Sequence, residues 1–225
     1  MDDFPLVQES AISQYEKAAK GDVKLYPSLE LVRLIKWFLK SNKGKMLEYG
    51  FGSGCNTIHL LKSGYNVYGL DVSTNWIKKT NLRIKKIKSI KRKPKLIRLL
   101  PNSKKLPFPT NYFNYIIAMS VLSLLGNRRK VKNLLEEFRR ILKPNGKIIL
   151  DINDQKSVFS GKDNKIKNNI YKAKPVDSYI STYCLRTEKD FKNLIKPYFK
   201  IKDTGFSSHK LMNRTITEFI ICATK

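Results

Sequence analysis

Acidic residues are scarce in this chain and missing altogether from one long part of it. The sequence has 18 Asp and Glu against 45 Lys and Arg, which gives a formal net charge of +27. No acid lies between Asp71 and Glu136, an interval that holds seventeen Lys or Arg. A field of this sign attracts polyanions such as RNA, anionic lipid surfaces or phosphorylated molecules. An ordinary solvated helix face is the other interpretation, because Ile77, Thr80 and Ile84 fall at helical spacing between the lysines.

Cysteines and long apolar runs are also few. The three cysteines, Cys55, Cys184 and Cys222, are scattered and form neither a disulfide framework nor the spacing of a metal site. The longest apolar stretch, residues 115–125, is too short to span a bilayer. Residues 1–5 lack the basic and apolar segments of a signal peptide. We therefore expect a cytoplasmic protein without a bound metal.

Glycines are concentrated where the chain is most informative. Residues 45–49 predict a strand, Gly50, Gly52 and Gly54 follow it at alternate positions, and a helix begins directly afterwards. Such a loop turns tightly and lets the backbone approach a ligand, at which the free N–H groups of the helix point. A second apolar run ends in Asp71, twenty-one residues after Gly50. An acid at the end of the next strand is placed to accept hydrogen bonds from ribose hydroxyls. The pattern predicts a nucleoside cofactor.

The spacing of this loop distinguishes between cofactors. A dinucleotide fingerprint needs a glycine at position 55, which is Cys55 here, whereas an acid, Glu48, stands two residues before Gly50. This arrangement resembles the first motif of the class I S-adenosylmethionine-dependent methyltransferases. Residues 106–117 look like the segment that leads into the fourth strand of that family, and residues 137–147 look like its following helix, turn and fifth strand. Together these blocks cover about residues 30–153.

The resemblance implies one domain over residues 1–225, an α/β Rossmann-like fold with a doubly wound, seven-stranded, mostly parallel sheet. We expect an N-terminal helical cap (1–44, with a helix over 29–38) and a cofactor-binding core (45–153). We expect strands over 45–49, 66–70, 95–100, 112–119 and 147–152 and a helix over 128–142. Residues 155–186 show little periodicity and are interpreted as an insertion or lid. A C-terminal helix and an antiparallel hairpin (187–225) then close the sheet.

Cofactor contacts follow from the same resemblance, and the implied cofactor is S-adenosyl-L-methionine. In open α/β sheets ligands lie beyond the carboxyl ends of the strands. The residues placed there are Glu48, Gly50, Phe51, Gly52, Gly54, Asp71, Val72, Asn102, Ser103, Met119 and Ser120. Two positions depart from the family pattern, because Asn102 and Asn114 stand where acids are common. Loss of these acids is the motive for an alternative hypothesis, a cofactor-binding or scaffolding protein that has lost catalysis.

Catalytic candidates are harder to select from the sequence. The protein must align a nucleophile with the methyl group, and a hydroxyl acceptor also needs its proton removed. Asp151, Asp154 and His209 fall near the expected site, with His209 in the connection between the last two strands, although a solvated loop histidine is the commoner case. The insertion adds aromatic residues, Tyr171 and Tyr183 among them, which either line an acceptor pocket or form the small core of a lid.

Some acceptor classes can be argued against. Residues 120–123 do not form the Pro-Pro-aromatic element with which methyltransferases grip the exocyclic amines of adenine or cytosine, and no Pro-Cys dipeptide offers a nucleophile for pyrimidine C5. Residues 26–33 look like methyltransferases linked with sugar modification. We therefore expect a small-molecule acceptor, with an oxygen nucleophile and some anionic character among the options. The alternative enzyme acts on RNA or another polyanion through the basic segment 78–98. The sequence leaves the oligomeric state open.

Overall fold

Seven strands form one sheet, and its five members β1 to β5 run parallel. The computed structural model describes residues 9–21, 24–100, 103–160, 165–173, 180–211 and 214–225. The strands of this sheet are β1 (Lys45–Tyr49), β2 (Asn66–Asp71), β3 (Lys95–Arg98), β4 (Phe113–Ala118), β5 (Leu142–Asn153), β9 (Lys200–Leu211) and β10 (Arg214–Thr224). Their order is β3-β2-β1-β4-β5-β10-β9, and β10 pairs antiparallel with both β5 and β9. The expected mostly parallel sheet with a C-terminal antiparallel hairpin is confirmed.

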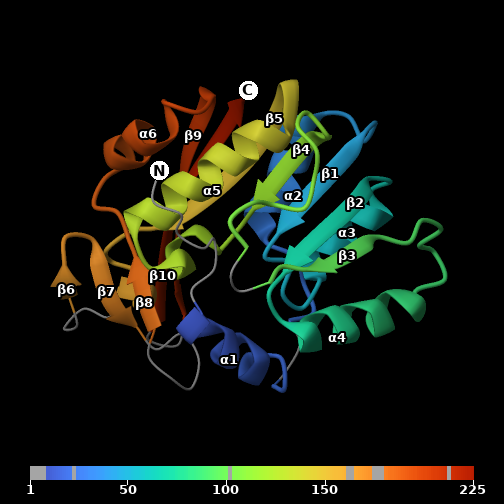
Figure 1. Cartoon of the computed structure of the whole chain (residues 1–225), viewed down its shortest axis with the longest axis horizontal. Coiled ribbons are helices and arrows are strands. Elements are labelled where there is room, and N and C mark those ends of the chain that lie inside the picture. Colours follow the sequence, from blue (N-terminus) through green and yellow to red (C-terminus); the bar gives the residue numbers. More distant parts are fainter. Residues whose placement is uncertain (1–8, 22–23, 101–102, 161–164, 174–179, 212–213) are drawn as a thin grey trace.

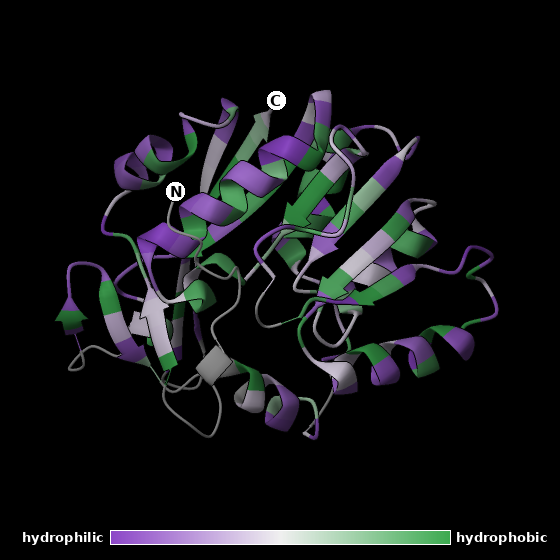
Figure 2. Cartoon of the chain, viewed as in Figure 1, coloured by the Kyte–Doolittle hydropathy of each residue, from purple (hydrophilic) through white to green (hydrophobic). Residues whose placement is uncertain are grey.

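Helices cover both faces of the sheet (Figure 1). They are α1 (Glu9–Ala18), α2 (Leu29–Leu34), the π-helical η1 (Ile35–Leu39), α3 (Cys55–Lys62), α4 (Thr74–Lys85), the 3-10 helices η2 (Leu122–Leu125) and η3 (Val158–Ser160), α5 (Arg128–Ile141) and α6 (Glu188–Ile195). Helices α5 and α6 pack on one face through Phe138 and Phe191. On the other face, α2, α3 and α4 contribute Leu31, Leu60 and Ile84 to a second core. The outward side of α5 is strongly hydrophilic (Figure 2), as its amphipathic spacing requires.

Polar caps fix where several helices begin. The Ser73 hydroxyl accepts a hydrogen bond from the Trp76 N–H at 3.1 Å at the start of α4. Thr187 and Asp190 form a reciprocal capping box at the start of α6. Asn127 caps α5 by accepting from the Lys130 N–H at 3.0 Å. Ser73 and Thr187 were the caps expected from the sequence, and both are confirmed.

Four element boundaries differ from expectation. Strand β5 begins at Leu142 rather than at 147, because the turn residue Asn145 (φ +61°) lies beside the chain end and its N–H donates to the Lys225 carbonyl. The helix expected over 29–38 changes to π geometry at Ile35. Strand β3 ends at Arg98 rather than at 100. Strand β9 continues to Leu211, so His209 lies within a strand, opposite Ile216, and not in a connection.

The segment expected to be irregular contains a second sheet. Strands β6 (Lys165–Lys167), β7 (Ile170–Ala173) and β8 (Ile180–Tyr183) pair antiparallel in that order. Each strand has only three or four residues, which is too short for a period of two to stand out in the sequence. Tyr171 and Tyr183 are buried and do not line the large cavity described below, which favours the small-core interpretation for both.

None of the helices in the described parts of the chain has the length and apolar character needed to cross a bilayer.

Candidate functional site

The glycine loop after β1 has a backbone that other residues adopt only with strain. Gly50, Gly52 and Gly54 have φ values of +72°, +50° and +77°, in the left-handed region that favours glycine. A Cβ on Gly50 would lie 2.8 Å from a Val121 methyl, and a Cβ on Gly54 would overlap Thr80. A Cβ on Gly52 would meet open space. The loop therefore packs closely at both ends and leaves its middle open.

A cavity of about 630 Å³ lies against this loop. Its walls come from the ends of β1, β2 and β4, from α1, and from the segment before α2. Of the residues expected to hold a cofactor, those that line it are Gly50, Phe51, Gly52, Asp71, Val72, Met119 and Ser120. The position agrees with the rule that ligands in such sheets lie beyond the carboxyl ends of the strands, where the strand order reverses. In this sheet the reversal falls between β1 and β4.

Asp71 ends β2 with its carboxylate held by backbone donors. One oxygen accepts from the Gly52 N–H at 2.8 Å and the other from the Ser73 N–H at 2.9 Å. Burial raises the pKa of this carboxyl, and the hydrogen bonds oppose that shift. The side chain thus joins the glycine loop to the start of α4 at the edge of the cavity. It keeps unused lone pairs, since each oxygen takes a single hydrogen bond from the described residues.

Glu48 lies beneath the loop rather than in the cavity. The residue is 2% exposed and accepts a hydrogen bond from the Thr57 hydroxyl of α3. Burial raises the pKa of its carboxyl to about 8. Glu48 therefore ties β1 to α3, which accounts for one of its two expected roles, holding the loop. Its distance from the cavity lining leaves the other role, a contact with the cofactor, without support.

The remaining predicted positions divide into three cases. Gly54 is the N-cap of α3 and does not line the cavity. Ser103 is described and is likewise not part of the lining. Asn102 lies outside the described residues.

Helix α1 provides a wall that the sequence did not predict. Tyr15 and Ala18 line the cavity, and α1 lies below the strand ends in Figure 1. The Tyr15 hydroxyl is buried and has no hydrogen-bond partner among the described residues. Glu16 attaches the helix to α4, because its carboxylate accepts from the Thr74 N–H at 2.6 Å and from the Asn75 N–H at 3.2 Å. The segment 9–18 has no strong sequence signal apart from its mixed polar pattern.

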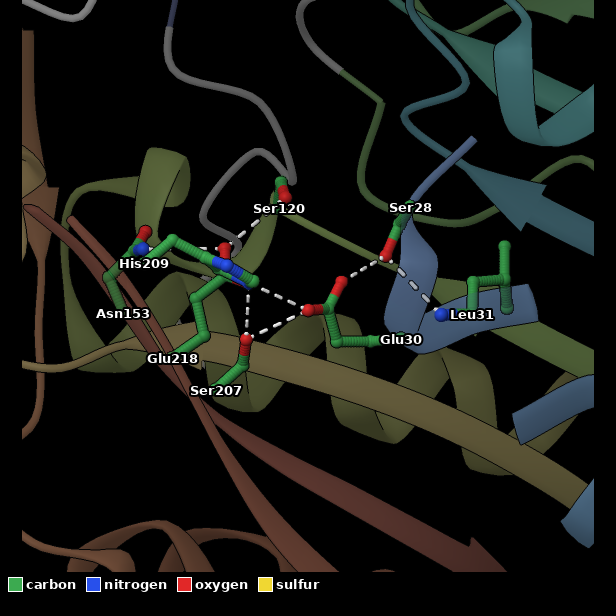
Figure 3. A network of polar contacts seen from close by, with 8 residues as sticks. All are labelled: Ser28, Glu30, Leu31, Ser120, Asn153, Ser207, His209 and Glu218. Atoms are coloured by element: carbon green, nitrogen blue, oxygen red, sulfur yellow. Dashed lines mark hydrogen bonds and ion pairs between the residues drawn. The ribbon is translucent and has the colours of Figure 1, made fainter. Parts of the chain in front are cut away.

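A network of polar side chains lies behind two serines of the cavity wall (Figure 3). The Ser28 hydroxyl donates to Glu30 at 2.9 Å. The same carboxylate accepts from the Ser207 hydroxyl and bonds the Nε2 atom of His209, both at 2.8 Å. Hydrogen bonds from His209, Ser207 and Ser28 outweigh burial and lower the pKa of Glu30 to about 2. The imidazole of His209 is half exposed and does not line the cavity.

The second serine, Ser120, is held by two acids. Its N–H donates to Asp151 at 2.6 Å, and its hydroxyl donates to Glu218 at 3.4 Å. Ser120 has a φ of +57°, a strained value for a residue with a Cβ that such contacts help to maintain. Asp151 is 1% exposed, and its other oxygen has no partner among the described residues. Burial and the nearby charge of Glu218 raise its pKa well above the usual range.

Asp154, the third catalytic candidate, forms a turn. One of its oxygens accepts hydrogen bonds from the N–H groups of Lys156 and Ser157, at 2.7 and 3.1 Å, and from the Thr217 hydroxyl. The residue is buried, and it does not line the cavity. This local role in the chain reversal after β5 accounts for the residue.

Other lining residues were missed at the level of the sequence. Trp76 comes from α4, Phe159 from η3, and Tyr26 and Pro27 from the segment before α2. Only residues 26–28 carried a signal, through their resemblance to sugar-modifying enzymes. Within the described part of the chain, no group of three or more His, Cys, Asp or Glu is arranged to hold a metal ion.

The cavity has the chemistry that a nucleoside cofactor needs. The open Gly52 backbone, the spare lone pairs of Asp71 and the unpartnered Tyr15 hydroxyl all lie at its wall. Residues 47–150 match a family model described as a methyltransferase domain. These residues form a methyltransferase domain of the class I S-adenosylmethionine-dependent type, whose cofactor is S-adenosylmethionine.

Particular relatives agree with this class. A methyltransferase from Methanosarcina mazei described as SAM-dependent superposes with a TM-score of 0.71 at 18% identity, over 89% of this chain and 99% of its own. The N-methyltransferase NodS from Bradyrhizobium japonicum, solved with S-adenosyl-L-homocysteine, gives a TM-score of 0.69 at 11% identity, over 96% and 99% of the two chains. An uncharacterized protein of Methanocaldococcus jannaschii is 28% identical over 85% of this chain. A second one is 30% identical over 68% of this chain, and the alignments cover 66% of the length of each.

Proposed function

We propose that this protein transfers a methyl group from S-adenosylmethionine to a hydroxyl oxygen of a small molecule. The observation that carries the proposal is one cavity with two chemically different ends. The glycine loop and Asp71 form one end, and Ser28 and Ser120 form part of the other. A volume of about 630 Å³ falls within the usual range for small-molecule sites.

Asp71, Val72, Phe51 and the loop glycines are the residues that would hold the cofactor. The spare lone pairs of Asp71 suit ribose hydroxyls, and the Tyr15 hydroxyl offers a further polar contact that nothing in the described chain satisfies. When bound, the cofactor supplies a methyl group on a sulfonium, which is a good leaving group. The protein then has to position the acceptor and exclude water.

The acceptor end supports a nucleophile that carries a hydrogen. The hydroxyl hydrogens of Ser28 and Ser120 are committed to Glu30 and Glu218, so both serine oxygens have lone pairs left to accept a hydrogen bond from an acceptor hydroxyl. Carboxylates behind this wall favour a neutral acceptor over an anionic one.

A route for the proton follows from the same network. It runs from Ser28 through Glu30 to the half-exposed imidazole of His209. We assign His209 and Glu30 to proton removal and Asp151 to positioning of Ser120. The resemblance of residues 26–33 to sugar-modifying enzymes supports a sugar-related acceptor.

Calorimetric titration with S-adenosylhomocysteine tests the cofactor end. We expect micromolar binding that Asp71→Ala weakens at least tenfold, about 1.4 kcal/mol, because the ribose loses its acceptor. Asp71→Asn, which keeps one acceptor oxygen, should lose less, and Asp203→Ala, an exposed acid on β9, should bind like the wild type. Equal affinity in Asp71→Ala and the wild type would refute the assignment of Asp71.

A panel of acceptors tests the chemistry. With the wild type we expect methyl transfer to hydroxyl compounds, sugars among them, and a large loss in Glu30→Gln and His209→Ala at unchanged cofactor affinity. Tight cofactor binding without transfer to any acceptor would instead support the scaffolding alternative.

A further inference from the structure

The basic segment forms a continuous exposed surface at one edge of the molecule. It comprises the end of α4 and the loop that leads to β3, the edge strand of the sheet. We call it the basic surface and define it by six exposed residues, Lys85, Lys86, Lys88, Lys91, Arg92 and Lys93. In Figure 1 this edge lies opposite α6 and β9.

Nothing in the described chain neutralises this surface. The ion pairs of the described residues lie elsewhere, between Arg140 and Glu137, Lys192 and Glu188, and His209 and Glu30. None of the six side chains makes a hydrogen bond or ion pair with another described residue, and the sequence around them has no acid from 72 to 135. Six uncompensated cations within nine residues repel one another, and a structural role does not require them.

Helix-end electrostatics explain only part of this arrangement. Cations are favourable in the last turn of a helix because of its dipole, which covers Arg83 and Lys85 of α4. The effect is confined to that turn. It leaves Lys88, Lys91, Arg92 and Lys93 in the following loop without an explanation.

The surface is also separate from the cavity. Helix α4 begins beside the cavity at Thr74 and has twelve residues, so its two ends lie about 18 Å apart at 1.5 Å per residue. Acids cluster at the first end, where Glu16 and Asp71 bind its N-terminus. The cations gather at the second. An anion at the basic surface would therefore be outside the reach of the methyl-transfer site.

We propose that the basic surface binds RNA through its phosphates. A row of closely spaced cations complements a strand of regularly spaced phosphates, and such binding needs no sequence readout. An anionic membrane is a poorer fit, because peripheral binding also needs an apolar face. On α4 the large exposed apolar side chain is Leu82 alone among the described residues. RNA binding here is independent of the small-molecule function proposed above.

Fluorescence anisotropy with a labelled, mixed-sequence single-stranded RNA of about 20 nucleotides is the direct test. The variant reverses four charges of the surface: Lys85→Glu, Lys86→Glu, Arg92→Glu and Lys93→Glu. The matched control reverses four exposed charges on α6 and β9: Lys189→Glu, Lys196→Glu, Lys200→Glu and Lys202→Glu. Both lower the net charge from +27 by the same amount, so a difference between them reports position and not total charge.

We expect the wild type to bind with an affinity that falls linearly on a log–log plot against salt. The surface variant should lose at least tenfold more affinity than the control, and a Lys/Arg→Gln version should fall between variant and wild type. Titration with S-adenosylhomocysteine shows that each variant is folded. No binding by the wild type, binding insensitive to salt, equal losses in the two reversal variants, or binding to phosphatidylserine vesicles in place of RNA would each overturn the proposal.

Discussion

Glu48 shows how one buried carboxyl can serve a loop without touching a ligand. Its only exposed neighbourhood is closed by β1 and α3, and it meets Thr57 there. Burial raises its pKa to about 8, so the side chain carries its proton in much of the population at neutral pH. A protonated carboxyl avoids the cost of a buried charge beside Asp71.

Glu48→Gln should change how stability depends on pH. The pKa of the folded wild type, about 8, lies above the ordinary value of 4.5. The native state therefore binds the proton more tightly, and this contribution is complete below 4.5 and lost as pH rises towards 8. The slope is at most about 1.4 kcal/mol per pH unit. Gln has no such titration, so the stability of wild type relative to Glu48→Gln should fall across that window.

Urea denaturation at several pH values between about 5 and 8 measures this difference. Glu136→Gln, at an exposed position of α5, is the control for loss of one carboxyl group. A difference between wild type and Glu48→Gln that stays constant with pH would contradict the assigned pKa.

Residues that were predictable and residues that were not differ in how their position is encoded. The loop glycines and Asp71 act through backbone geometry within one contiguous motif, so their spacing alone places them. Tyr15, Trp76 and Phe159 reach the same cavity from α1, α4 and η3. Their convergence depends on tertiary packing, for which a single sequence holds no local pattern.

At the scale of elements, α1 is attached to the rest of the fold chiefly by one side chain. Glu16 accepts hydrogen bonds from the Thr74 and Asn75 N–H groups and from the Ser73 hydroxyl. These are orphan donors at the start of α4, where a carboxylate also meets the positive end of the helix dipole. The contact holds Tyr15 and Ala18 at the cavity.

Glu16→Ala should therefore affect both stability and binding. We expect a loss of about 1 kcal/mol, as for removal of a helix cap, and a lower Tm by about 2–4 °C. Affinity for S-adenosylhomocysteine should fall as α1 loses its position. Calorimetry gives both quantities, and Lys17→Ala, an exposed neighbour on α1, is the control. If Glu16→Ala bound S-adenosylhomocysteine as tightly as Lys17→Ala, α1 would not be part of the site.

Prediction of elements succeeded where burial is two-sided and failed where it is partial. The central strands β1, β2 and β4 are apolar runs, and the chain places them as expected. The first half of β9 was predicted, but its continuation Ser207-Ser208-His209 reads as a polar loop. Pairing with Glu218, Thr217 and Ile216 of β10 makes it strand, and this is a tertiary effect that overrides propensity.

Charge acts on the molecule as a whole. With a net charge of +27, self-repulsion opposes the compact state, and salt screens it with a Debye length of about 10 Å at 0.1 M. We expect the Tm to rise between about 0.02 and 0.3 M NaCl, as measured by scanning calorimetry. Reversal of Lys85, Lys86, Arg92 and Lys93 should raise the Tm at low salt and flatten its salt dependence. A wild-type Tm that is constant or falls over this range would show that repulsion is negligible.

The way the chain is distributed around the cavity has an evolutionary consequence. One wall is built from a single contiguous stretch, residues 49–76, while the opposite wall is assembled from separate segments around Lys24, Ser28, Ser120 and Phe159. Changes in those segments alter the second wall one piece at a time and leave the first intact. Divergence among descendants of such a chain can thus exchange one metabolite for another without rebuilding the shared scaffold, which is how one architecture comes to serve many reactions.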